Sequence, residues 1–224
     1  MLRLAAAVLI GLIVIAGGIW ILTQVLASHE TRYQNKGAYD WETKLHSGNT
    51  EASNQAHTVV INQILPHLTE VMFHDTNDSS FRISLVEKLN NLPGVTIVFA
   101  EASTRRAEAA TGIGQFEAVA EPAVPALIQA VKGSDDAVRP AALTSLGKIH
   151  SQPDVVLPLL ISYLDNQELN SHAAEGLGYF GPVAKPALPK LVPLLEVRDK
   201  DLHHAVVEAL KKIDPESSAT NGVK

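Results

Sequence analysis

The stretch VRPAALTSLGKI, residues 138–149, decides the fold because the chain repeats its pattern. Its apolar positions 138, 142, 146 and 149 are spaced by four, four and three residues, which is one face of an α-helix. Shifting the sequence by 31 to 33 residues aligns this stretch with RRAEAATGIGQF from residue 105, LNSHAAEGLGYF from residue 169 and LHHAVVEALKKI from residue 202. Four equivalent helices are therefore predicted.

Three further segments alternate with these helices. AVPALIQAV, VLPLLISYL and ALPKLVPLL begin at residues 123, 156 and 187, and their shared apolar columns again have helical spacing. The third position of each is a proline, which the start of a helix tolerates. Pro193 lies one turn deeper and is expected to kink the last of these helices. Such helix pairs bury their apolar stripes only by stacking, so the predicted fold is an all-α, short α-solenoid.

The combined pattern, xxVPxLIxxLxD followed by xVRxxAAxxLGxI, resembles the HEAT repeat over roughly residues 105–214, in its short, phycobilisome-lyase-type form. In that family an Asp in the turn pairs with an Arg early in the second helix and forms a ladder between repeats. Asp135 and Arg139 match these two positions. The next copies have Asn166 with Asn170, and then Asp199 with His203, so the expected ladder is incomplete.

The glycines of GLGYFG, residues 176–181, match a dinucleotide-binding pattern, but the repeat gives them another role. A nucleotide-binding loop follows a strand and opens a helix, whereas this stretch ends a predicted helix. Gly178 shares a column with Gly114 and Gly147, where a missing side chain allows close helix packing. Gly181 lies where a helix C-cap is expected, and Lys211 replaces the column glycine in the last copy.

Residues 4–26 form an apolar run whose only polar side chains are Thr23 and Gln24, long enough for a single transmembrane helix. We interpret residues 1–27 as an uncleaved signal anchor that exports the remainder. A signal peptide cleaved near Val25-Leu26-Ala27 is the alternative. A cytoplasmic orientation also stays open, because basic residues lie on both sides of the run.

The rest of the predicted organisation surrounds the repeats at 104–214. Residues 28–55 are expected to be a solvated polar spacer and 215–224 a disordered tail. Residues 56–103 are expected to form an irregular helical cap, with helices at 57–74 and 81–92, the first kinked or split at Pro66. The apolar run 95–100 has no assigned role.

The composition of the chain argues against several classes of function. The formal net charge is −6, and residues 104–214 hold 11 Lys and Arg against 14 Asp and Glu, which disfavours a nucleic-acid partner. The chain has no cysteine, so thiol chemistry is excluded. No catalytic, cofactor or metal residues are assigned, since no nucleophile elbow, phosphate loop or His-Glu pair inside the repeats is present.

The remaining class of function is binding to another molecule through the surface of the solenoid. The resemblance implies that the second helices line the side of the solenoid where partners dock. We predict a non-enzymatic scaffold or adaptor for another protein at a membrane surface, with no small-molecule substrate; the alternative is a HEAT-like repeat enzyme such as a bilin lyase. The predicted partner-binding residues, with Tyr179 as the anchor, are Arg139, Lys148, Glu175, Tyr179, His204, Glu208 and Lys212.

Overall fold

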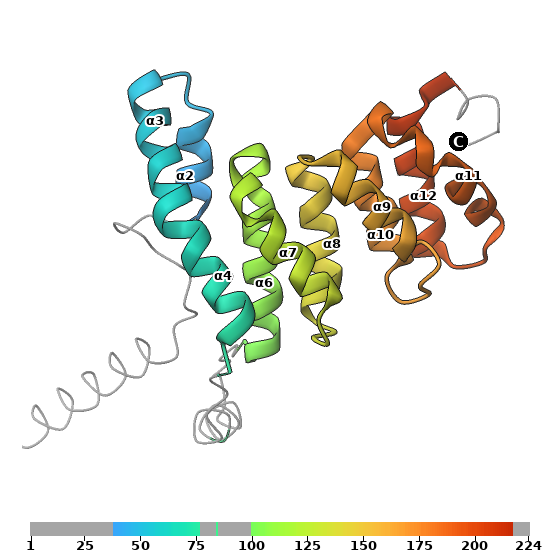
Figure 1. Cartoon of the computed structure of the whole chain (residues 1–224), viewed down its shortest axis with the longest axis horizontal. Helices are drawn as coiled ribbons and strands as arrows, with labels where there is room; N and C mark the ends of the chain where they lie inside the picture. Colours follow the sequence, from blue (N-terminus) through green and yellow to red (C-terminus); the bar gives the residue numbers. More distant parts are fainter. Residues whose placement is uncertain (1–37, 77–83, 85–99, 217–224) are drawn as a thin grey trace, which may run out of the picture. The chain divides into compact units, whose positions relative to one another are not determined.

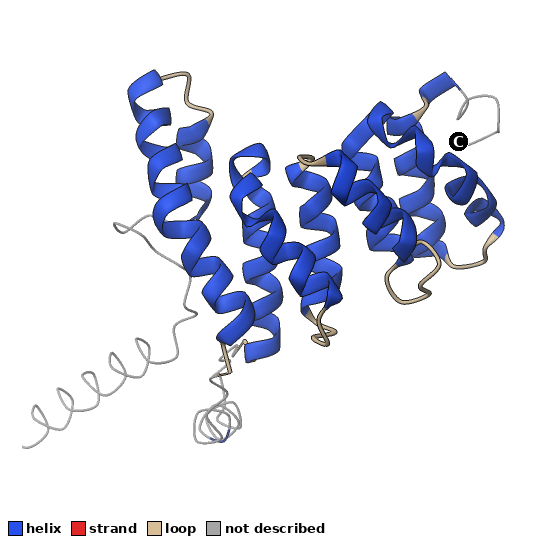
Figure 2. Cartoon of the chain, in the orientation of Figure 1, coloured by secondary structure: helices blue, strands red, loops and turns tan. Residues whose placement is uncertain are grey.

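The computed structural model describes residues 38–76, 84 and 100–216, and the regular structure of these residues is helical (Figures 1 and 2). The helices described below belong to one compact unit. The predicted anchor at 1–27 lies outside the described residues, as do nearly all of the predicted helix 81–92 and of the run 95–100. Among the residues that are described, no helix is both long enough and apolar enough to cross a bilayer.

The N-terminal part of the unit corrects the predicted polar spacer. Within residues 28–55 the structure has α2 (Ala38–Leu45) and the first part of α3 (Thr50–Val59), which pack against each other. Trp41 of α2 is completely buried. The Asn49 side chain caps α3 by accepting hydrogen bonds from the Glu51 and Ala52 amides at 3.0 and 3.1 Å. One buried ring in a short helix leaves no helical period in the sequence, which is why the pattern missed it.

Pro66 was expected to kink its helix or to split it in two, and the structure shows no split there. Helix α3 continues through a π-helical turn, η1 (Val60–Ile64), directly into α4 (Leu65–His74). In that wider turn the Leu65 amide donates to the carbonyl of Val60, five residues back. The π turn ends just before Pro66, which has no amide hydrogen to donate. The helix predicted at 57–74 is confirmed, although it begins earlier.

The predicted helix pairs are confirmed across the repeat region. Helix α4 pairs with α6 across the residues left undescribed, and each later pair follows within the chain. Pro193 ends the short α11, after which the chain continues as a 3-10 turn. The elements are α6 (Ala102–Gln115), η2 (Glu117–Ala123), α7 (Val124–Lys132), α8 (Val138–Ile149), α9 (Pro153–Tyr163), α10 (Asn170–Phe180), η3 (Gly181–Ala187), α11 (Leu188–Leu191), η4 (Val192–Glu196) and α12 (Lys200–Ile213).

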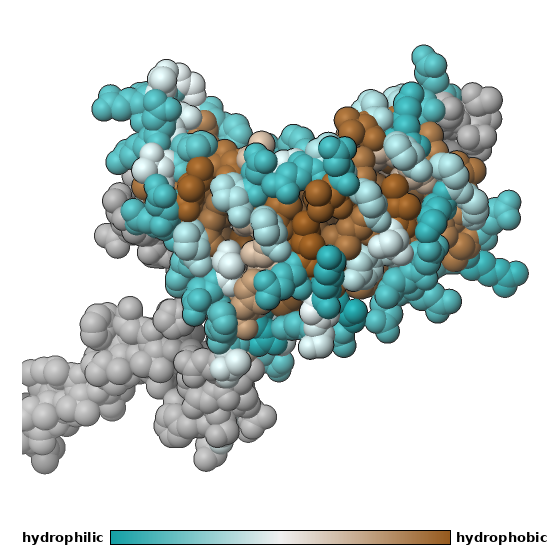
Figure 3. All heavy atoms as spheres, in the orientation of Figure 1, coloured by the Kyte–Doolittle hydropathy of each residue, from teal (hydrophilic) through white to brown (hydrophobic). Residues whose placement is uncertain are grey.

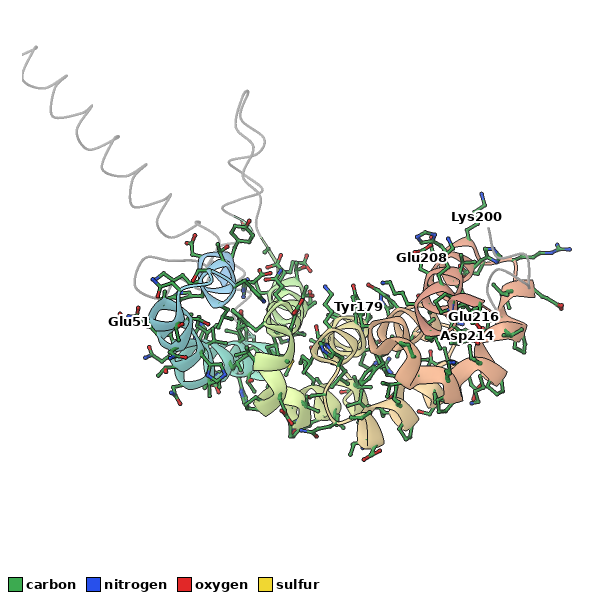
Figure 4. All side chains as sticks on the ribbon, turned by 90° about the horizontal axis from the view of Figure 1, so that it is seen from above. Glu51, Tyr179, Lys200, Glu208, Asp214 and Glu216 are labelled. Carbon is green, nitrogen blue, oxygen red and sulfur yellow. The ribbon has the colours of Figure 1, made fainter. Side chains whose placement is uncertain are left out.

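The second helices form the continuous layer of this unit. Helices α6, α8, α10 and α12 pack on one another in succession, with α7 packed on α8 and α9 on α10 (Figure 4). The aligned apolar column residues of α8, such as Leu146 and Ile149, are fully buried. Between α7 and α9, apolar side chains reach the surface (Figure 3), and there the Tyr163 hydroxyl donates to the Val131 carbonyl at 3.1 Å.

Close approach of the second helices depends on the glycine column. A Cβ on Gly147 would lie 2.4 Å from the Cα of Gly176, and one on Gly114 would lie 2.7 Å from the Cβ of Ser145. Gly178 faces Ala209, with 3.1 Å to its Cα. The predicted packing role of these glycines is therefore confirmed. Gly181, with φ of 56°, is the C-cap of α10, as expected.

We predict that Gly147→Ala lowers the free energy of unfolding by about 2 kcal/mol, because the added methyl group must push α8 and α10 apart. The matched control is Gly112→Ala on α6, where a Cβ would meet only the Leu68 side chain, at 3.5 Å. That change should leave stability unchanged or raise it by up to about 1 kcal/mol, since alanine favours a helix over glycine. Urea denaturation followed by circular dichroism measures both, and equal effects of the two changes would contradict the packing role.

Candidate functional site

Three side chains follow the glycine column and form a row across the second helices. Lys148, Tyr179 and Lys212 each come directly after an aligned position, namely Gly147, Gly178 and Lys211. The Nζ of Lys212 lies 4.8 Å from the centre of the Tyr179 ring, and the Nζ of Lys148 lies 5.9 Å from it. Both distances fall within the range of cation–π attraction. Two lysines on the helices flanking α10 therefore converge on one aromatic ring.

Glu175, one turn before Tyr179 on α10, is linked to the hydroxyl groups around it. Its carboxylate accepts from the Tyr179 hydroxyl at 3.4 Å and from the Thr144 hydroxyl of α8 at 3.3 Å. Partial burial raises the pKa of the Tyr179 phenol, and the charge of Glu175 and the hydrogen bond to it raise it further. Tyr179 thus stays neutral at physiological pH, and its side chain is 38% exposed.

A groove of about 450 Å³ runs between α10 and α12. Its floor contains the small residues Gly178, Ala205 and Ala209. Its ionisable lining residues are His172, Glu175, Asp201, His204, Glu208 and Lys212. In Figure 4, Tyr179 and Glu208 lie along the same side of the unit.

A second groove, of about 300 Å³, lies between α8 and α10 and also takes in Thr111 of α6. Thr144 and Lys148 line it from α8, and His172 and Glu175 line it from α10. Because His172 and Glu175 also line the first groove, the two grooves adjoin along α10. Together the two adjoining grooves extend across three consecutive second helices, α8, α10 and α12.

Glu208 forms an ion pair with a lysine of its own helix. Lys211 of the same helix donates to its carboxylate at 3.0 Å. This hydrogen bond and the charge of Lys211 lower the pKa of Glu208, and the charges of His204 and Lys212 lower it further. The lysine that replaces the column glycine in the last copy is exposed, as the repeat alignment indicated, and it neutralises Glu208.

The structure brings together six of the seven predicted partner-binding residues. They line the two grooves, and we call them the second-helix surface: Lys148, Glu175, Tyr179, His204, Glu208 and Lys212. The seventh, Arg139, does not line either groove and pairs instead with Asp136, three residues before it. That these residues bind a partner stays a prediction.

The Asp–Arg ladder takes a form that the sequence did not reveal. Asp135 accepts a hydrogen bond from the Arg106 Nε at 2.6 Å, and Arg106 is the residue that aligns with Arg139 in the preceding copy. For Arg139, the turn that follows has Asn166 in place of an acid, and the Arg139 Nε is buried without a hydrogen-bond partner. A carboxylate in the turn thus pairs with the preceding repeat, and Asn166 cannot supply that charge.

The same column also has a second role, in the turn before each second helix, that all three copies keep. Asp135, Asn166 and Asp199 each accept a hydrogen bond from an amide two residues later, at 3.1, 2.9 and 2.9 Å. At Asp199 the bonds cap α12, whereas at Asp135 and Asn166 they close the turn before α8 and α10. Such a bond requires only a short side chain with an oxygen acceptor, so asparagine serves there as well as aspartate.

Two ionisable residues that line the grooves, His172 and Asp201, were not among the predicted partner-binding residues. His172 lies three residues before Glu175 and so shares its helical face. That spacing could have identified it, whereas the position of Asp201 depends on how α12 begins. In the part of the chain that the structure covers, no group of three or more His, Asp or Glu side chains could hold a metal ion.

Comparison with known proteins agrees with the observed fold. The family model described as HEAT repeats matches residues 100–168, which extend from the start of α6 into the turn before α10. This match and the helical fold support HEAT repeats over these residues, and the helix pairs continue the same arrangement beyond them. A search of the curated proteins found no match to the chain.

Proposed function

We propose that this chain is a non-enzymatic scaffold or adaptor that holds another protein on its second-helix surface. The observation that carries the proposal is the convergence of six polar and aromatic side chains from α8, α10 and α12 on two adjoining grooves. HEAT repeats commonly mediate protein–protein interaction, and stacked repeats present extended surfaces for it. The repeat length of 31 to 33 residues supports the short, phycobilisome-lyase-type form.

Tyr179 is the proposed anchor of the contact. Its ring is partly exposed at the centre of the row, between lysines from both neighbouring helices. Tyrosine is enriched among interface residues that contribute most to affinity, because a rigid ring covers a large area at a small entropic cost. A protein partner fits this site better than a small molecule, since the two grooves are open along three helices.

We further propose that residues 4–26 anchor the solenoid in a membrane and that the folded unit is exported. The apolar length of that run supports the anchor. Because α2 already begins at residue 38, only residues 27–37 connect the two, and they span at most about 40 Å when fully extended. The solenoid would therefore work close to the membrane surface.

Crosslinked pull-down from membranes with the full chain tests the docking surface. The double change Tyr179→Ala with Glu175→Arg removes the anchor ring and reverses the charge beside it. We expect it to reduce partner capture at least about tenfold, as loss of a central aromatic contact does at other interfaces.

The matched control is Tyr39→Ala with Glu121→Arg, which makes the same chemical changes at exposed positions outside the grooves. Capture should be unchanged in this variant. Equal capture by both variants and the unaltered chain would show that the partner docks elsewhere. A stoichiometric metal ion or bilin absorbance in the purified protein would favour an enzyme instead.

Protease protection in cells with an intact inner membrane tests the proposed location. If the folded unit is exported beyond the membrane, external protease should digest it in cells whose outer barrier is opened and whose inner membrane is intact. A chain lacking residues 4–26 should be protected, because it would remain inside. Protection of the full chain under the same conditions would contradict export.

A further inference from the structure

We infer that Lys148 and Lys212 receive an acidic side chain of an extended partner segment, which docks against the Tyr179 ring. This inference rests on the proposed scaffold function and names the chemistry of the partner. The two lysines beside the Tyr179 ring indicate an acidic partner. The other residues that line the grooves indicate which class of acidic partner fits.

Neither lysine of the row has a carboxylate partner among the described residues. Lys211 pairs with Glu208 and Lys190 with Asp165, whereas Lys148 and Lys212 lie over the Tyr179 ring and form no ion pair in the described structure. Two ammonium groups without an ion-pair partner therefore lie beside one ring. A carboxylate supplied by a partner would pair with them.

The nearby acids do not supply that carboxylate. Glu175 is engaged by the hydroxyl groups of Thr144 and Tyr179, and it forms no ion pair in the described structure. Glu208 has a direct bond to Lys211, and Lys212 affects its pKa only as a weaker, more distant charge. The ring meanwhile attracts both ammonium groups through cation–π contacts and so favours their position beside Tyr179.

The floor of the groove fits an extended segment. Gly178, Ala205 and Ala209 present small side chains there, so a partner backbone can approach the helices closely. The groove is also lined by Asp201 and Glu175, which would repel a second negative charge. A continuous polyanion such as a nucleic acid is therefore disfavoured, and a protein segment with an isolated Asp or Glu is favoured.

The test selects a phage-displayed library of random 12-residue peptides on the full chain in detergent. Fluorescence anisotropy then measures an enriched peptide and its counterpart with Asp and Glu replaced by Asn and Gln. We expect enrichment of acidic residues, and an affinity loss of at least about tenfold both in Lys148→Glu with Lys212→Glu and on neutralising the peptide.

The matched control is Lys132→Glu with Lys185→Glu, which changes net charge equally at exposed positions outside the grooves and should leave affinity within about twofold. Lys148→Gln with Lys212→Gln repeats the test without charge reversal, and circular dichroism checks that each variant is folded. Peptides that bind without acidic preference, or without dependence on these lysines, would overturn the inference and leave the scaffold function standing. No enriched peptide would count against the scaffold function itself. Binding of the oligonucleotide dT12 with the same lysine dependence would overturn the assignment to a protein partner.

Discussion

The close contact between α8 and α10 at Gly147 sets the geometry of the whole second-helix layer. A Cβ there would lie 2.4 Å from the Cα of Gly176, so backbone meets backbone with no side chain between them. Each glycine inside a helix costs about 1 kcal/mol relative to alanine, and tight packing of the neighbouring helices has to offset that cost. The same column brings α10 next to α12 at Gly178. A single position of the repeat, the glycine column, therefore sets the spacing of the second helices.

The surface chemistry follows from that spacing. Because the helices lie so close, the residues after the column contact each other across repeats, and Tyr179 meets a lysine on either side. One turn earlier, Thr144 and Glu175 meet in the same way. Variation at these outward positions costs the fold little, since the buried columns alone hold the helices together. A repeat can in this way keep one architecture and change its binding chemistry from copy to copy.

Much of the fold could be predicted from periodicity, because the buried columns repeat with the helical spacing. The outward row could be predicted too, since a column on a helix face stays a column after stacking. Other features depend on single contacts that leave no period. Trp41 is the buried contact of a short helix in a polar segment, and Arg106 of one repeat pairs with Asp135 in the turn of the next. The convergence of two lysines on Tyr179 depends on distances between helices, which sequence spacing does not give.

Helix spacing at the glycine column creates the row of Lys148, Tyr179 and Lys212. NMR chemical shifts of the lysine ε-methylene protons test it, because an aromatic face shifts nearby protons upfield. We expect upfield shifts for both lysines, and these shifts should disappear in Tyr179→Leu. In Gly147→Ala, kept below its unfolding temperature, the Lys148 shift should shrink while the Lys212 shift remains. Unshifted lysine protons in the unaltered chain, or shifts that survive Tyr179→Leu, would show that the two lysines do not lie against the Tyr179 ring.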